Sequence, residues 1–212
     1  MIEDFIRSIV NAAPTQRRVQ EDIEEMKEET EEWRSNLFPW IGADELELLS
    51  LNHESKWYKQ SFGKALKGVY YSIYNEPMIV FGYKSYLRGR VNTLIWATTK
   101  KHVFMYRGSK KKTDFFIDGE AVGFITREGL MYGGSRNRLL GRCNAFSEEH
   151  DSVVIWDKEV AHLLKQTQKE RVNPRVFEVM EKMVMKEKLL LIALGFLTIL
   201  QGTFEIDGAL PE

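Results

Sequence analysis

The sequence has little that points to a secreted protein. Cys143 is its single cysteine among 212 residues, so no disulfide can form within the chain. Nothing therefore indicates an oxidising compartment. The first thirteen residues include Glu3 and Asp4 and lack a long apolar centre, which is not the pattern of a signal peptide. We expect a cytoplasmic location, and the alternative is a cytoplasmic protein that attaches to a membrane surface.

Motifs for catalysis and metal binding are equally scarce. The four histidines include no pair at i, i+4 spacing and no accompanying cysteine pair. Gly134-Ser135 lacks the flanking pattern of a nucleophile elbow, and Gly63-Lys64 lacks the full phosphate-loop spacing. We therefore expect no enzymatic activity and no cofactor, and Cys143 is interpreted as a small buried side chain.

Charge is balanced overall but divided along the chain. The range Glu21–Glu32 holds eight acidic residues and one basic residue, Lys27. The range Lys56–Lys112 holds thirteen lysines and arginines and one acidic residue, Glu76. This polarity is compatible with an anionic partner, and equally with the acidic segment lying near the basic segment of the same chain.

A long apolar run, LLLIALGFLTIL, occupies Leu189–Leu200. A helix that is apolar on every face has to be hidden in a core or in lipid. Twelve residues at about 1.5 Å per residue cover about 18 Å, whereas a bilayer interior needs about 30 Å. We expect the protein's own strands to enclose this helix. A membrane anchor over Lys188–Leu200 is the alternative.

Two amphipathic helices are expected near the N-terminus. Apolar residues recur at helical spacing over Ile2–Val10, and Pro14 ends that helix. A second helix starts near Thr15. Its apolar stripe, which includes Thr30, consists of Val19, Ile23, Met26, Trp33 and Leu37. Two kinds of packing remain open, namely a coiled coil and a helix docked along the edge of a larger body.

From Leu46 the apolar period changes to two, which is typical of strands. The expected strands, separated by turn residues, are Leu46–Leu48, Tyr70–Tyr74, Met78–Tyr83, Thr93–Thr98, His102–Arg107, Asp114–Ile117, Ala121–Thr126, Gly129–Tyr132, Leu139–Cys143 and Ser152–Trp156. Asp118-Gly119 predicts a type I′ hairpin turn, because that turn needs positive φ at both central residues.

Helices are expected again towards the C-terminus. We predict a short helix over Lys158–Lys169 and a longer one that begins at Asn173-Pro174, as N-cap and first helical position. The longer helix carries an apolar stripe over Val176–Val184, enters the apolar run and stops at Gly202. Gly195, which lacks a side chain, is expected to let a strand come close.

One architecture accommodates all these elements. The fold is expected to be mainly β (α+β), with an antiparallel closed barrel of about ten to twelve strands around the C-terminal hydrophobic helix and the N-terminal helices packed outside. Closure removes exposed strand edges, and the helix fills a barrel too wide for strand side chains alone. Residues 1–40 are expected to form a helical appendage and residues 41–212 the barrel domain.

Two stretches carry a resemblance to a known family. FFIDGEAVGFITREGLMYGGSRNRLLG, Phe115–Gly141, is similar to short hairpins built around a glycine turn, and KLLLIALGFLTILQGTFE, Lys188–Glu205, looks like a terminal hydrophobic helix. Both features, within roughly Leu46–Glu205, resemble the tubby C-terminal-like superfamily, which includes phospholipid scramblases and plant LURP-one-related proteins. The proline-rich arm and cysteine cluster of many scramblases are missing, so the resemblance implies the fold more than lipid scrambling. Tubby proteins bind phosphoinositides through basic residues, but none of those positions is carried over to this chain.

The candidate ligand-binding residues are bases in and beside the expected loops: Arg88, Arg90, Lys100, Lys101, Arg107, Lys110, Lys111 and Lys112. Loops that join alternate strands gather at one end of a barrel, so these charges are expected to converge on one rim. Each Lys or Arg near an anionic membrane surface contributes about 1 kcal/mol. The alternative is that lysines in turns only solubilise hairpins and protect strand edges.

We therefore predict a non-enzymatic intracellular module that binds an anionic ligand or a membrane surface, such as a phosphoinositide. Aromatic residues interleave with the basic residues, as a stacking platform for nucleic acid requires. No nucleic-acid-binding signature accompanies them, so nucleic acid is disfavoured as a partner. The alternative function is a protein–protein interaction or scaffold subunit that works through the acidic N-terminal helix, with a protein partner or as a homo-oligomer.

Overall fold

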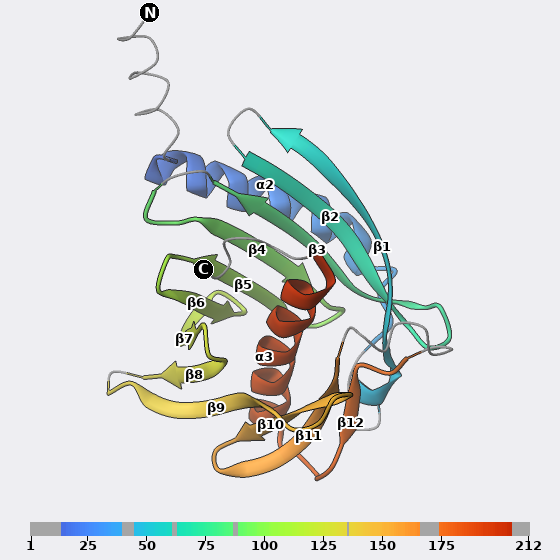
Figure 1. Cartoon of the computed structure of the whole chain (residues 1–212). Coiled ribbons are helices and arrows are strands. Elements are labelled where there is room, and N and C mark those ends of the chain that lie inside the picture. The colour runs from blue at the N-terminus through green and yellow to red at the C-terminus, as the bar shows by residue number, and fades with distance from the viewer. Residues whose placement is uncertain are drawn as a thin grey trace, which may run out of the picture.

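A single curved sheet dominates the computed structural model, which describes residues 14–39, 45–60, 63–86, 89–134, 136–165 and 174–204. Twelve antiparallel strands follow one another in sequence order from β1 to β12. The sheet curves around helix α3 (Met185–Phe204), and helix α2 (Gln16–Arg34) lies outside it (Figure 1). The predicted helix over Ile2–Val10 lies outside the described residues.

The strands are short and closely connected. Their bounds are β1 Leu49–Gln60, β2 Gly63–Ser72, β3 Pro77–Ser85, β4 Thr93–Thr98, β5 Val103–Gly108, β6 Lys112–Ile117, β7 Glu120–Thr126, β8 Leu130–Gly133, β9 Arg138–Ala145, β10 His150–Ile155, β11 Lys158–Leu164 and β12 Phe177–Val179. A 3-10 helix, η1 (Leu46–Leu48), precedes β1, where a strand was predicted. The tight hairpin at Asp118-Gly119 is confirmed, with φ of 53° and 84°.

The barrel is nearly closed where the start of β1 meets the residues before β12. Backbone hydrogen bonds of 2.7 and 3.0 Å join Leu49–Leu51 to Pro174–Val176. Between them, Ser50 forms a β-bridge with Arg175. The predicted mainly β barrel of ten to twelve strands around a C-terminal helix is confirmed, and its seam is this short bridge.

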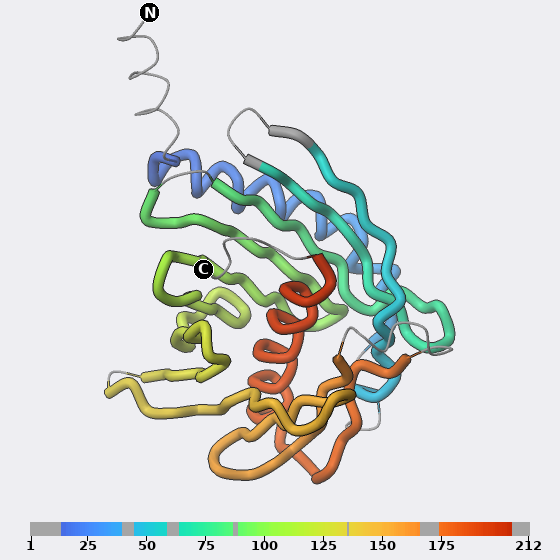
Figure 2. Tube along the Cα trace, viewed as in Figure 1, coloured from blue at the N-terminus to red at the C-terminus, as the bar shows by residue number. Residues whose placement is uncertain are grey.

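Helix α3 fills the interior of the barrel (Figure 2). Every residue over Leu190–Leu197 is buried, as are Ile199 and Leu200. From β5 the buried Tyr106 hydroxyl donates a 2.9 Å hydrogen bond to the Ala193 carbonyl oxygen. By length and composition α3 is the one helix in the described part of the chain that could cross a membrane. In this structure its apolar run is enclosed by strands, as predicted.

Gly195 makes room for the ring of Phe177, which reaches α3 from β12. A Cβ atom at this position would lie 2.6 Å from two ring atoms of Phe177, whose side chain is itself buried. Real Cβ atoms essentially never come so near another heavy atom. Gly195 was expected to let a strand come close; what lies next to it is the side chain of Phe177 from β12.

The predicted helix over Lys158–Lys169 is wrong over its first part, because Lys158–Leu164 is strand β11. The turn before it, Trp156-Asp157, has φ of 48° and 65° and joins β10 directly to β11. Neither residue is a glycine, so the turn gave no glycine signal in the sequence. Pairing with β10 and β12 then sets the conformation of the segment, whatever its local helical spacing.

The long C-terminal helix starts later than predicted. Pro174–Val179 is extended and completes the sheet, and α3 begins only at Met185. The Glu187 carboxylate accepts a 2.8 Å hydrogen bond from the Val184 backbone N–H, which caps this later start. Gly202 does not stop the helix, which continues to Phe204. The seam of the barrel, which needs an extended segment beside β1, overrides the local helical pattern.

Helix α2 begins where predicted, with Thr15 as its N-cap. It docks on the outer face of β3 and β4, outside the barrel as expected, and the sheet rather than a coiled coil covers its apolar stripe. Val19, Ile23 and Met26 are buried against the sheet, but Trp33 is 44% exposed, so the predicted stripe is wrong at that residue. Leu37 is buried after the helix has ended.

Replacing Gly195 tests the packing of α3 against β12. Gly195→Ala is expected to destabilise the protein by about 1–3 kcal/mol, because the added methyl group collides with the Phe177 ring. The measurement is the free energy of unfolding by urea.

The matched control is Gly202→Ala, at an exposed position of the same helix. It is expected to stabilise by up to about 1 kcal/mol through helix propensity. Equal effects of the two substitutions would contradict the close approach.

Candidate functional site

The predicted basic residues are divided between the two ends of the barrel. Thr93, Gly108 and Thr113 are neighbours in the register of β4, β5 and β6, so the β3–β4 and β5–β6 connections lie at one end. That end carries Arg90 and the range Lys110–Lys112. Lys100 and Lys101 lie in the β4–β5 turn at the opposite end, and Arg88 lies outside the described residues.

We call the end of the barrel formed by the β3–β4, β5–β6 and β7–β8 turns the basic end. It consists of Arg90, Lys110, Lys111, Lys112 and Arg127. Arg127, in the β7–β8 turn, was not predicted, and its guanidinium donates a hydrogen bond to the Lys110 carbonyl oxygen. Arg90, Lys110 and Lys111 are exposed, whereas the Lys112 ammonium pairs with Asp114 at 2.8 Å. The tertiary structure thus gathers at least four solvent-accessible cations on neighbouring turns.

Arg107 lies on the outer face of β5 near the same end. Its guanidinium carbon lies 5.2 Å from the centre of the Phe116 ring. Its buried Nε atom has no hydrogen-bond partner among the residues that the structure describes. An unsatisfied buried donor costs about 1–3 kcal/mol, and this N–H is closed off from solvent, so an external ligand does not reach it in this structure.

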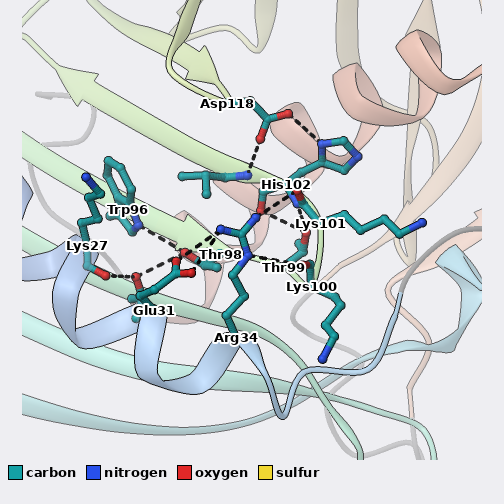
Figure 3. A network of polar contacts seen from close by, with 12 residues as sticks. Lys27, Glu31, Arg34, Trp96, Thr98, Thr99, Lys100, Lys101, His102 and Asp118 are labelled. Carbon is teal, nitrogen blue, oxygen red and sulfur yellow. Dashed lines mark hydrogen bonds and ion pairs between the residues drawn. The ribbon is translucent and has the colours of Figure 1, made fainter.

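The turn that carries Lys100 and Lys101 is occupied by contacts within the protein (Figure 3). Arg34, at the end of α2, donates to the carbonyl oxygens of Lys100 and Lys101 at 3.3 and 3.1 Å. The Lys100 ammonium donates to the Ser35 carbonyl oxygen. His102 and Asp118, 2.7 Å apart, join this turn to the next. These contacts hold α2 on the sheet and give Lys100 a structural partner.

The acidic helix neutralises part of the basic segment. The Lys84 ammonium, whose side chain is only 3% exposed, lies 2.8 Å from an Asp22 oxygen and 2.5 Å from a Glu25 oxygen. The Tyr86 hydroxyl donates to the other Asp22 oxygen at 2.6 Å, and burial raises the pKa of Tyr86. Lys67 forms a further ion pair with Glu29. Part of the acidic segment therefore pairs with part of the basic segment within the same molecule.

A groove of about 370 Å³ lies between α2 and the outer face of β1–β3. Trp33 and Tyr58 line it, and the ammonium groups of Lys56 and Lys67 lie 5.4 and 5.3 Å from the centre of the Tyr58 ring. Glu29 and Glu54 also line it. The two acidic and two basic side chains balance, so the groove favours neither an anionic nor a cationic ligand.

Groups suited to catalysis or metal binding are scarce in the described ranges. No three His, Cys, Asp or Glu residues there are placed to hold a metal ion. Burial raises the pKa of Cys143 to about 12, and the neighbouring Asp151 adds to the rise. His162 lies between Glu159 and Glu178 at 3.3 and 3.6 Å, and the hydroxyl of its cross-strand neighbour Ser152 donates to the same Glu159 oxygen.

Comparisons with known proteins add no relative. No family model, curated protein or solved structure matches this chain.

Removing Asp22 tests the ion pair beneath α2. Asp22→Ala is expected to destabilise the protein by about 3 kcal/mol, because Lys84 stays buried without its closest fully buried partner. The double variant Asp22→Leu, Lys84→Met is expected to recover most of this loss. Urea denaturation measures both.

Glu24→Ala, on the exposed side of the same helix, is the control and is expected to change stability by less than about 0.5 kcal/mol. An Asp22→Ala variant as stable as this control would contradict a structural role for the pair.

The raised pKa of Cys143 predicts a slow reaction with alkylating reagents. At pH 8 the thiolate fraction is expected to be about a thousandfold below that of an unperturbed cysteine, because the pKa rises from 9.0 to about 12. Iodoacetamide labelling followed by mass spectrometry compares the native protein with the urea-unfolded protein. Equally fast labelling of both would refute the burial of the thiol.

Proposed function

We propose that this protein is a non-enzymatic module whose basic end binds an anionic ligand or a membrane surface. The observation that carries the proposal is the gathering of Arg90, Lys110, Lys111 and Arg127 on adjacent turns. Cations on the outer face, such as Lys84 and Lys67, are paired with acids of α2. The basic end is thus the cationic surface best placed for an external partner.

The energetics favour a flat anionic surface. Each Lys or Arg near an anionic bilayer contributes about 1 kcal/mol, so four such residues together supply about 4 kcal/mol. Screening reduces this attraction at high ionic strength, because the Debye length is about 8 Å at physiological salt. Attachment is therefore reversible and salt-sensitive, which suits a peripheral cytoplasmic protein.

We also propose membership of the tubby C-terminal-like superfamily. The support is the agreement between the arrangement that the resemblance implies and the twelve strands that surround α3. Phosphoinositide headgroups carry several phosphates on one ring, which suits a group of cations from several turns. They are thus the first anionic ligand to test.

Charge reversal at the basic end is the test. Lys110→Glu with Lys111→Glu is expected to weaken co-sedimentation with phosphoinositide-containing vesicles by about thirtyfold or more, because two attractive charges of about 1 kcal/mol each are lost. Binding of the unaltered protein is expected to fall steeply with added salt.

Lys101→Glu, at the opposite end of the barrel, is the matched control and is expected to bind as the unaltered protein does. Binding that is absent, insensitive to salt or equally reduced in both variants would end the proposal. Circular dichroism of each variant separates lost binding from lost folding.

A second candidate function, a scaffold or protein-interaction role, is favoured by the outward face of α2. Its apolar face is used by its own sheet, and five acidic residues lie exposed on the opposite face. Glu28 and Glu32 are two of them; Glu21, Glu24 and Glu31 form ion pairs with Arg17, Lys27 and Arg34 of the same helix. Such a face suits a basic partner. Glu24→Lys with Glu28→Lys is expected to abolish low-salt binding of a polylysine probe in calorimetry. An unchanged binding isotherm would remove this candidate.

A further inference from the structure

Strand β1 leaves the barrel with one edge unpaired in the described part of the chain. Its first residues, Leu49–Leu51, are bonded on both sides, to β2 and to Pro174–Val176. From His53 to Gln60 the strand pairs with β2 alone. In Figures 1 and 2 this part of β1 forms the outer margin of the sheet. Exposed strand edges of this length are ready templates for pairing with another chain.

The side chains along this edge alternate between two faces. Glu54 and Lys56 pair with Val69 and Lys67 on the outer face, where the groove beside α2 lies. His53 and Trp57 face the interior of the curved sheet. The rings of both contact Phe204, with centres 5.0 and 6.3 Å from it. Even so, Trp57 is 44% exposed, which is unusual for so large an apolar side chain beside an open edge.

We propose that β1 pairs antiparallel with β1 of a second copy of this chain, around a two-fold axis at Ser55. In this register Glu54 lies opposite Lys56 of the second copy, and Lys56 lies opposite Glu54. His53 lies opposite Trp57 on the inner face. Because of the two-fold symmetry each of these contacts occurs twice, as in an isologous dimer. Opposite charges and aromatic pairs across neighbouring strands each contribute about 0.2–1 kcal/mol.

Neighbouring registers are disfavoured by the same residues. An axis at Glu54 puts the two Glu54 carboxylates opposite each other, and an axis at Lys56 does the same with the two ammonium groups. An axis between residues sets outer-face side chains against inner-face ones, because side chains alternate along a strand. Ser55 is therefore the central position at which charge and face both match.

Single and paired charge reversals test this register. Sedimentation velocity is expected to detect a concentration-dependent dimer of the full chain. Glu54→Lys and Lys56→Glu are each expected to raise the dimer dissociation constant by about tenfold or more, since each places like charges opposite each other twice. The double variant Glu54→Lys, Lys56→Glu restores opposite pairs and is expected to restore the dimer.

Mixing the two single variants provides a sharper test. One variant then presents lysine at both positions and the other glutamate at both, so a mixed dimer regains two opposite-charge contacts. The mixture is expected to dimerise more tightly than either component alone.

Controls of the same charge change are Glu120→Lys and Lys182→Glu, at exposed positions away from β1. Both are expected to dimerise normally, as is the variant with Lys110→Glu and Lys111→Glu, which separates this inference from the proposed function. A monomer at every soluble concentration overturns the inference. A dimer that the β1 reversals leave unchanged, or that the double variant and the mixture fail to restore, also overturns it.

Discussion

The structure depends on hiding a helix that has no polar face. Residues 190–197 of α3 are all buried. A helix on the surface of the protein would expose some of them to solvent. Twelve consecutive antiparallel strands provide a curved wall wide enough to surround the helix, and Phe177 reaches it where Gly195 has no side chain. Each Å² of apolar surface that this interior removes from water stabilises the fold by about 25 cal/mol. The apolar interior is therefore the main source of stability.

The outer helix depends on charge as well as apolar contact. Val19, Ile23 and Met26 pack on the sheet, and the buried Lys84 next to them is matched by Asp22 and Glu25. A buried ion pair is a weak source of stability but a strong constraint on position, because a lone buried charge is costly. The helix is thereby held in one register on β3 and β4. Cations that it does not reach, above all those of the basic end, stay available to solvent.

Antiparallel order separates the surfaces of the molecule. Successive turns alternate between the two ends of the barrel, so lysines that are close in sequence, such as Lys101 and Lys110, lie at opposite ends. Among the residues that the structure describes, the seam closes between Leu49–Leu51 and Pro174–Val176 and leaves the rest of β1 at the margin. The proposed binding surface of turns and the proposed pairing edge of β1 therefore lie on different parts of the fold.

Period and composition determined much of this protein from the sequence alone: most of the strands, the Asp118-Gly119 hairpin, the start of α2 and the enclosed apolar helix. These features depend on local spacing and turn chemistry. Only the tertiary structure decided that Lys158–Leu164 and Phe177–Val179 are strands, because sheet pairing outweighs their helical spacing. It also decided which bases gather, since the β3–β4, β5–β6 and β7–β8 turns meet only after the sheet has formed. The acids opposite Lys84, about sixty residues away in the chain, were likewise set by packing.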